Sequence, residues 1–256
     1  MTLIAAFKIN NIPFILADLL LTSDPPPAQP QFMPLSPNRI SPPNARAPAG
    51  VRSKLLVLNG RLAIAFSGDL AAGTKLFADL QRRFSNSTPS EDALSSALQS
   101  WNVDKIISKR AWVVGWLATP EPRCFEWTAG PGAKVNFVSH AFRGSGASHF
   151  EREILPRRRS GMGDLTEEEA AVFFAVTKAN QILGDEMTKA SGLANHYGYS
   201  LEIAFWRDAV FEFQNKMVSI FMEVTIPDNG PISTRPISIR IYERHSLCID
   251  RNQQLL

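Results

Sequence analysis

Three side chains near the start of the chain carry the chemistry of an N-terminal nucleophile. Thr2 follows Met1, so removal of the methionine would leave a residue with both a hydroxyl and a free α-amine. A threonine hydroxyl is a weak nucleophile alone, but an α-amine with a reference pKa of about 7.7–8.0 can accept its proton. Such a site also needs a nearby cation and a carboxylate that holds this cation in place. Lys54 and Asp18 are the candidates for these two groups.

An apolar hairpin at the start of the chain is expected to position Asp18 beside residue 2. Residues 2–8 and 12–18 have the composition of strands, and Asn10-Asn11 separates them. Asparagine tolerates the positive backbone angles that a tight hairpin turn requires. Asp18 then lies at the end of the strand that pairs with the first one.

A second hairpin is expected in SKLLVLNGRLAIAFSG. Asn59-Gly60 is the strongest short hairpin signal in the chain, and apolar runs flank it on both sides. Lys54 begins the first of these runs and Gly68 ends the second. The two hairpins together could therefore bring Lys54 and Asp18 towards residue 2.

The rest of the chain alternates between predicted helices and strands. Helices are expected from Leu70 to about Arg83, after Thr88-Pro89-Ser90-Glu91 with Thr88 as the N-cap, and from the Thr166–Glu169 capping box to about Met187. Strands are expected at 111–118, 124–128 and 134–141, and in LEIAFW, VFEF, MVSIFMEVTI and ISIRIYE. This order favours an α+β fold of two sheets with helices on their outer faces over a parallel βαβ sheet.

Size and composition bound the class of protein. The 256 residues are 45% hydrophobic and suit one domain, and a formal net charge of +3 gives little reason to expect nucleic acid. No apolar run is long enough for a bilayer and no signal peptide precedes the first hairpin, so we expect a soluble, cytoplasmic protein. Cys124 and Cys248 suggest neither a disulfide framework nor a metal site, and the four histidines lack metal-ligand spacing. No cofactor or metal is therefore expected.

A proline-rich segment separates the two hairpins. Residues 24–50 hold half of the chain's 18 prolines, which excludes a helix or a central strand there. Two interpretations remain open. The segment is either a flap that borders the cleft at Thr2 and restricts substrate entry, or a disordered surface loop.

The motif order resembles the proteasome β-subunit family of N-terminal nucleophile hydrolases, which includes bacterial proteasome-like protease subunits. The motifs are TLIAAF, FILADLLLT, SKLLVLNGRLAIAFSG and RGSGA, with the two helices before the last of them. The resemblance covers nearly the whole chain as a single domain. It implies a four-layer αββα sandwich and threonine-type hydrolysis of a peptide or amide. It also implies a homo-oligomeric ring in which segments 70–83 and 90–100 contact neighbours, with an ATPase or related subunit as a possible partner.

Position by position, the resemblance assigns roles to seven residues. Thr2 matches the nucleophile, Lys54 the catalytic lysine and Asp18 the carboxylate that pairs with it. Ser145 matches the serine that hydrogen-bonds the free α-amine. The remaining matches concern the substrate: Thr22 and Gly68 would align it as an added strand, with the Gly68 N–H as oxyanion donor, and Phe66 would line the pocket for the side chain before the scissile bond.

The chain departs from the family pattern in three places. Leu20 stands where the family usually has an arginine, and ANHYGYS at 194–200 replaces the aspartate and serine that complete the amine network. Asn195, Tyr197 or Ser200 could rebuild that network, or it could be lost. The third departure is the length of the proline-rich insertion. These departures leave a second hypothesis, a catalytically inactive structural or binding subunit of the same fold.

Overall fold

Two antiparallel sheets of five strands form the centre of the protein. The computed structural model describes residues 3–22, 32–33, 36–40, 48–101, 111–130, 132–154, 165–189, 201–225, 233–243 and 249–251. The first sheet has the order β12 (Ala141–Arg143), β1 (Ile4–Ile9), β2 (Ile12–Asp18), β13 (Leu201–Arg207), β14 (Val210–Phe213). The second has the order β11 (Asn136–Val138), β10 (Pro122–Thr128), β9 (Trp112–Ala118), β8 (Leu62–Ser67), β7 (Leu55–Leu58). Adjacent strands in both sheets are antiparallel, as predicted.

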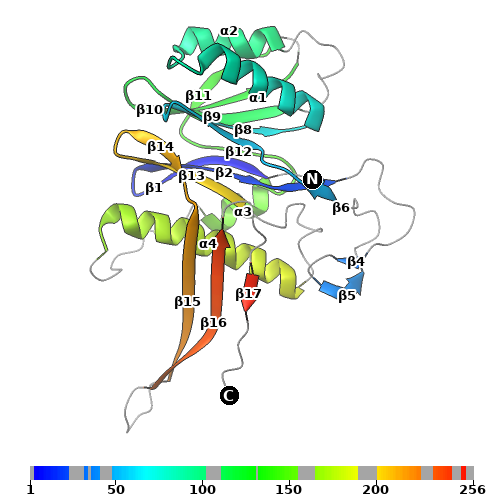
Figure 1. Ribbon diagram of the computed structural model, residues 1–256, viewed down its shortest axis with the longest axis vertical. Coiled ribbons are helices and arrows are strands. Elements are labelled where there is room, and N and C mark those ends of the chain that lie inside the picture. The colour runs from blue at the N-terminus through cyan, green and yellow to red at the C-terminus, as the bar shows by residue number, and fades with distance from the viewer. Residues whose placement is uncertain are drawn as a thin grey trace.

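Helices cover the outer face of each sheet, which confirms the predicted α+β arrangement (Figure 1). α1 (Leu70–Phe84) and α2 (Glu91–Trp101) pack on the second sheet, and α3 (Ala147–Ile154) and α4 (Glu167–Lys189) pack on the first. A third apolar cluster fills the space between the two sheets. No helix in the described part of the chain is long and apolar enough to cross a bilayer.

The central strands are apolar on both faces because both faces are buried. Along β1, Ala5 and Phe7 pack against the helices, whereas Ile4 and Ala6 face the other sheet. A strand that is covered on both sides loses the polar alternation of a half-exposed one. This explains why the first hairpin is a nearly continuous apolar run.

The two predicted hairpin turns are present. Asn10, Asn11 and Asn59 have φ of 49°, 65° and 50°, and Gly60 has φ of 62°. These are the positive angles that a two-residue turn needs to match the twist of its strands. A third such turn at Asp208-Ala209 joins β13 to β14, with φ of 47° and 62°.

Three smaller sheets complete the described structure. β15 (Lys216–Thr225), β16 (Ser233–Glu243) and β17 (Ile249–Arg251) form one that extends away from the body of the protein past α4 (Figure 1). β3 (Leu20–Thr22) pairs with β6 (Pro48–Val51), and β4 (Phe32–Met33) pairs with β5 (Ser36–Ile40). The proline-rich segment thus contains short strands that the sequence did not predict. They occur only in two-stranded sheets, where a proline that lacks an N–H is tolerated.

Two sequence predictions about local structure were wrong. α2 begins at Glu91, and its N-cap is Ser90, not Thr88, because the Ser90 hydroxyl accepts the Ala93 N–H at 3.1 Å. The single strand expected at 134–141 is two strands: β11 pairs with β10 in the second sheet, and β12 pairs with β1 in the first. The chain passes from one sheet to the other between them.

The helix α3 was not predicted. Its eight residues offer a periodicity signal that depends on Ala147, Phe150 and Ile154 alone. Three apolar positions are too few to distinguish a short helix from a loop by pattern. Its apolar face nevertheless packs fully, since Phe150 is completely buried.

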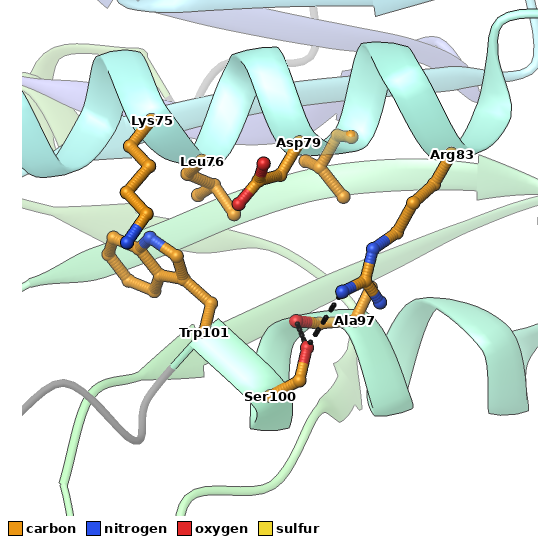
Figure 2. Close-up of a pocket in the computed structure, with 8 residues that line it drawn as sticks. Lys75, Leu76, Asp79, Arg83, Ala97, Ser100 and Trp101 are labelled. Carbon is orange, nitrogen blue, oxygen red and sulfur yellow. Dashed lines mark hydrogen bonds between the residues drawn. The ribbon is translucent and has the colours of Figure 1, made fainter.

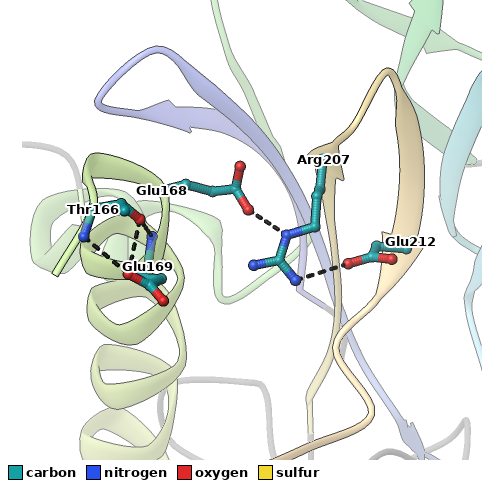
Figure 3. A network of polar contacts seen from close by, with 5 residues as sticks. All are labelled: Thr166, Glu168, Glu169, Arg207 and Glu212. Atoms are coloured by element: carbon teal, nitrogen blue, oxygen red, sulfur yellow. Dashed lines mark hydrogen bonds and ion pairs between the residues drawn. The ribbon is translucent and has the colours of Figure 1, made fainter.

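The start of α4 is held by a capping box and by an ion-pair network (Figure 3). The Thr166 N–H donates to Glu169 Oε2 at 2.9 Å, and the Glu169 N–H donates to Thr166 Oγ1 at 3.2 Å, as predicted. The bonds that Thr166 donates lower the pKa of Glu169. Arg207 pairs with Glu168 on the helix and with Glu212 on β14, which fastens the helix to the β13–β14 hairpin.

The turn at Gly60 yields a stability prediction with an internal control. Gly60 and Gly132 both have positive φ, but a Cβ at Gly60 would lie 2.7 Å from Val210 Cβ, whereas one at Gly132 would meet nothing within 4 Å. Gly132→Ala should cost about 1 kcal/mol of unfolding free energy, for the backbone conformation alone. Gly60→Ala should cost roughly 1–3 kcal/mol more because of overpacking. Urea unfolding measures the free energy of unfolding of both variants. Equal losses in the two variants would contradict a close approach of residue 60 to Val210.

Candidate functional site

A buried ion pair joins the ends of the two hairpins. Lys54 Nζ donates to Asp18 Oδ1 at 2.8 Å. Asp18 has no exposed surface, and Lys54 is 7% exposed. Lysine and aspartate are almost never this buried unless they are paired. Both residues were predicted at strand ends that could approach position 2, and in the structure their side chains contact each other.

Asp18 also binds the backbone that follows residue 2. The Leu3 N–H donates to Asp18 Oδ1 at 2.9 Å, and the Asp18 N–H donates to the Leu3 carbonyl oxygen at 2.9 Å. The nitrogen of Leu3 is the atom that the peptide bond joins to residue 2. Thr2 itself lies outside the described residues, but its covalent neighbour is therefore bonded to the carboxylate that holds Lys54.

Burial governs the electrostatics of this pair. Loss of solvent raises the pKa of Asp18, and the charge of Lys54 together with the hydrogen bonds from Lys54 and Leu3 opposes this shift. Oδ2 of Asp18 is buried and has no hydrogen-bond partner within the described part of the chain. In a medium of low dielectric constant, the attraction between the side chains of Asp18 and Lys54 is stronger than it would be in water.

A short crossing segment, residues 52–54, joins β6 of a two-stranded sheet to β7 of the second five-stranded sheet and carries Lys54. The Arg52 N–H donates to the Leu19 carbonyl at 2.9 Å, directly after Asp18. The Lys54 carbonyl accepts the Phe66 N–H at 3.0 Å, which continues the ladder between β7 and β8. The backbone on both sides of Lys54 is therefore anchored.

Lys54, Phe66 and Gly68 line one pocket of about 330 Å³. Its walls are mainly apolar and include Leu21 and Phe77, while Arg52 is exposed beside it. Three of the residues predicted for catalysis and substrate binding thus lie around a single cavity. The Asp18 carboxylate holds the lysine of this group.

Two close contacts shape the Phe66 side of this pocket. A Cβ at Gly73 of α1 would lie 2.3 Å from the Phe66 ring, so the helix can approach the ring only because residue 73 is glycine. Gly68 has φ of 148°, and a Cβ there would lie 3.1 Å from the Ala111 Cα. Gly68 ends the apolar run as predicted, and the chain after Ser67 requires glycine there for its conformation and for space.

The other predicted residues are placed in part. Thr22 ends β3, where it pairs with Pro48 at a β-bulge, so it is one residue from the pocket residue Leu21. Ser145 lies in the turn between β12 and α3. Residues 194–200, proposed for the amine network, lie outside the described residues. Catalytic roles for Thr2, Asp18, Lys54 and Ser145 and substrate roles for Thr22, Phe66 and Gly68 stay predictions.

Sequence reasoning missed a second buried carboxylate beside the pair. Glu202 on β13 has no exposed surface, and Ser53 Oγ donates to Glu202 Oε2 at 2.6 Å. In LEIAFW the glutamate had the spacing of an outward-facing polar residue. Its partner on β2, Ala17, faces the space between the sheets, and Glu202 shares that face. The burial of Glu202 therefore depends on a strand pairing that the local sequence does not reveal.

A second, smaller cavity lies between α1 and α2 (Figure 2). It measures about 130 Å³, and Arg83 donates to Ser100 across it at 3.3 Å. Trp101 lines it and also packs edge-on against Phe66, with ring centroids 5.8 Å apart. This cavity contains neither member of the buried pair, so it is separate from the candidate site.

Cys124, the cysteine in the described part of the chain, is free and buried. Burial raises the pKa of the Cys124 thiol to about 12, so the nucleophilic thiolate is scarce at neutral pH, as expected of an inert cysteine. Cys248 lies outside the described residues. Within the described ranges, no three histidine, cysteine, aspartate or glutamate side chains are grouped closely enough to hold a metal ion.

Comparison with known proteins identifies no family. No protein-family model matches the chain, and no curated protein matches its sequence.

The buried pair yields a prediction about stability. Lys54→Met should cost roughly 3–5 kcal/mol, because it leaves the buried Asp18 carboxylate without the charge that offsets its desolvation. Adding Asp18→Asn should recover most of this loss, since the amide oxygen still accepts the Leu3 N–H and no buried charge remains. Chemical denaturation of the two single variants and the double variant measures the coupling. Losses that simply add would mean that the pair contributes nothing as a pair.

Proposed function

We propose that the protein is a threonine-type N-terminal nucleophile hydrolase that acts on a peptide or amide, with Thr2 as the nucleophile. The observation that carries the proposal is the buried contact of Lys54 with Asp18, whose carboxylate also binds the nitrogen that follows residue 2. A fixed ammonium at this point, beside a pocket, is what activation of an N-terminal hydroxyl requires. The finer fold assignment, a four-layer αββα sandwich of this hydrolase class, belongs to the same proposal.

The proposed reaction proceeds through an ester intermediate. The α-amine of Thr2, freed by removal of Met1, accepts the hydroxyl proton while Oγ1 attacks the carbonyl carbon of the substrate. The Gly68 N–H stabilises the oxyanion, and the departing amine takes the proton from the α-ammonium. Water then attacks the ester and releases the acid, with the same amine as general base. The role of the Lys54 ammonium is to stabilise the deprotonated oxygen of Thr2.

The place of Ser145 close to the end of β12 is compatible with the role proposed for it. Ile4 pairs with Arg143, the last residue of β12, and Ser145 follows two residues later in the turn before α3. In the proposal, its hydroxyl bonds the free α-amine and orients it.

Ring assembly through α1 and α2 remains part of the proposal. Both helices bury one face on the second sheet and present their other residues outward, where neighbours could pack. A non-catalytic subunit is the second candidate, favoured by the replaced segment at 194–200 and by Leu20. The adduct experiment below distinguishes it from the enzyme.

Mass spectrometry of the purified protein tests the nucleophile. The intact mass should lack Met1, and a peptide β-lactone should add one acyl group to Thr2 through ester formation. Thr2→Ser should retain the adduct, whereas Thr2→Ala and Lys54→Met should lose it along with hydrolysis of a peptide amide library. Lys54→Met must be shown to be folded by circular dichroism. Processed, folded wild-type protein that takes no adduct and cleaves nothing would contradict the enzyme and favour the non-catalytic subunit.

The pocket yields a prediction about specificity. Its apolar walls suit a large aliphatic or aromatic side chain before the scissile bond, and the charges of Arg52 and Lys54 oppose a basic one. Peptide amides with leucine or phenylalanine at this position should have kcat/KM at least about tenfold above those with lysine or arginine. Phe66→Ala enlarges the pocket and should shift the preference towards bulkier aromatic groups. A preference for basic residues would rule out this pocket as the specificity site.

A further inference from the structure

Adjacent residues of the crossing segment bind carboxylates on neighbouring strands. Lys54 reaches Asp18 on β2 at 2.8 Å, and Ser53 reaches Glu202 on β13 at 2.6 Å. In the first sheet Asp18 pairs with Leu201, the residue before Glu202. The two carboxylates therefore lie one residue apart along paired strands, and the crossing segment is bonded to both.

Glu202 occupies a position where a carboxylate is costly. It pairs with Ala17, and directly opposed side chains in an antiparallel pair share one face of the sheet. Ala17 and Ala204 belong to the apolar cluster between the two sheets. Burying a carboxylate in such surroundings is unfavourable unless hydrogen bonds compensate it, and the Ser53 hydroxyl supplies one.

The bond from Ser53 restrains the backbone that carries Lys54. At 2.6 Å, the bond from the Ser53 hydroxyl to the Glu202 carboxyl group is a short hydrogen bond. Ser53 Oγ also lies 3.1 Å from the Leu55 carbonyl, but a hydroxyl has a single hydrogen, and the shorter contact is to the carboxylate. The direction of the Ser53 side chain is thereby set, and with it the peptide group that leads to Lys54.

We infer that Glu202 is a positioning residue for Lys54 and acts through Ser53. This inference rests on the proposed function, because it gives the lysine a position that matters for turnover. In this role, Glu202 limits the movement of the crossing segment, so that the Lys54 ammonium stays at Asp18.

Four variants and a matched control test this role by kinetics. Glu202→Gln keeps an acceptor but removes the charge, and Ser53→Ala removes the donor. Each should lower kcat about tenfold with KM changed less than about twofold, because misplacement of a catalytic group affects turnover more than binding. The double variant should be no slower than the slower single variant, since both changes break one bond. Ser53→Thr should restore most of the activity, and Glu212→Gln, on the neighbouring strand β14, should leave kcat unchanged.

A second measurement does not depend on activity. The ¹³Cε resonance of Lys54, assigned by its loss in Lys54→Met, should move in Glu202→Gln and Ser53→Ala and stay in place in Glu212→Gln. If wild-type protein has no hydrolytic activity, the proposed function fails, and this resonance still decides whether Glu202 positions the lysine. If Glu202→Gln does not fold, Ser53→Ala still tests the inference, because Ser53 is only half-buried. An unmoved resonance, an unchanged kcat or multiplicative losses in the double variant would overturn the inference.

Discussion

The position of one ammonium between two sheets is the constraint on which the candidate site depends. A lysine that is 7% exposed loses most of its hydration, and only an equally buried carboxylate offsets that loss. The carboxylate of Asp18 meets this need from the end of β2, while the Leu3 N–H bonds to the same oxygen. The site is therefore hydrogen-bonded to the backbone directly after residue 2. Movement of either hairpin would separate two charged groups that are largely shielded from water.

The neighbouring structure is arranged to keep that ammonium fixed. The Arg52 N–H, two residues before Lys54, donates to the carbonyl of Leu19, directly after β2, and the Lys54 carbonyl accepts the N–H of Phe66 on β8. The segment that holds the pair is thus anchored both at the end of β2 and in the second sheet. A group held from both sides loses little conformational entropy when a substrate arrives, which is how preorganised sites gain their effect. The same segment forms one wall of the larger pocket, so binding and activation would use one rigid element.

Local patterns were sufficient to predict the hairpins and the approach of Lys54 to Asp18. Asn10-Asn11 and Asn59-Gly60 have the backbone angles that their residue types favour, and two-residue turns leave little freedom in strand pairing. Features that depend on distant pairing were not predictable. Glu202 reads as a surface residue until β13 is known to lie beside β2, and the region 134–141 reads as one strand because nothing local marks a change of sheet. The predicted N-cap of α2 was wrong for a different reason. Thr88 and Ser90 are both residue types that cap helices well, and only the packing of the helix selects between them.

The pairing of β2 with β13 has a consequence for synthesis of the chain. Asp18 and its strand partner Leu201 are far apart in the sequence, so Leu201 emerges from the ribosome long after Asp18. Until then one edge of an almost wholly apolar hairpin has open hydrogen-bonding groups, which is the kind of edge that joins other chains. Long-range strand pairing of this type also folds slowly. The nascent first hairpin is therefore a segment that a chaperone could protect, and the rate of translation should influence the yield of native protein.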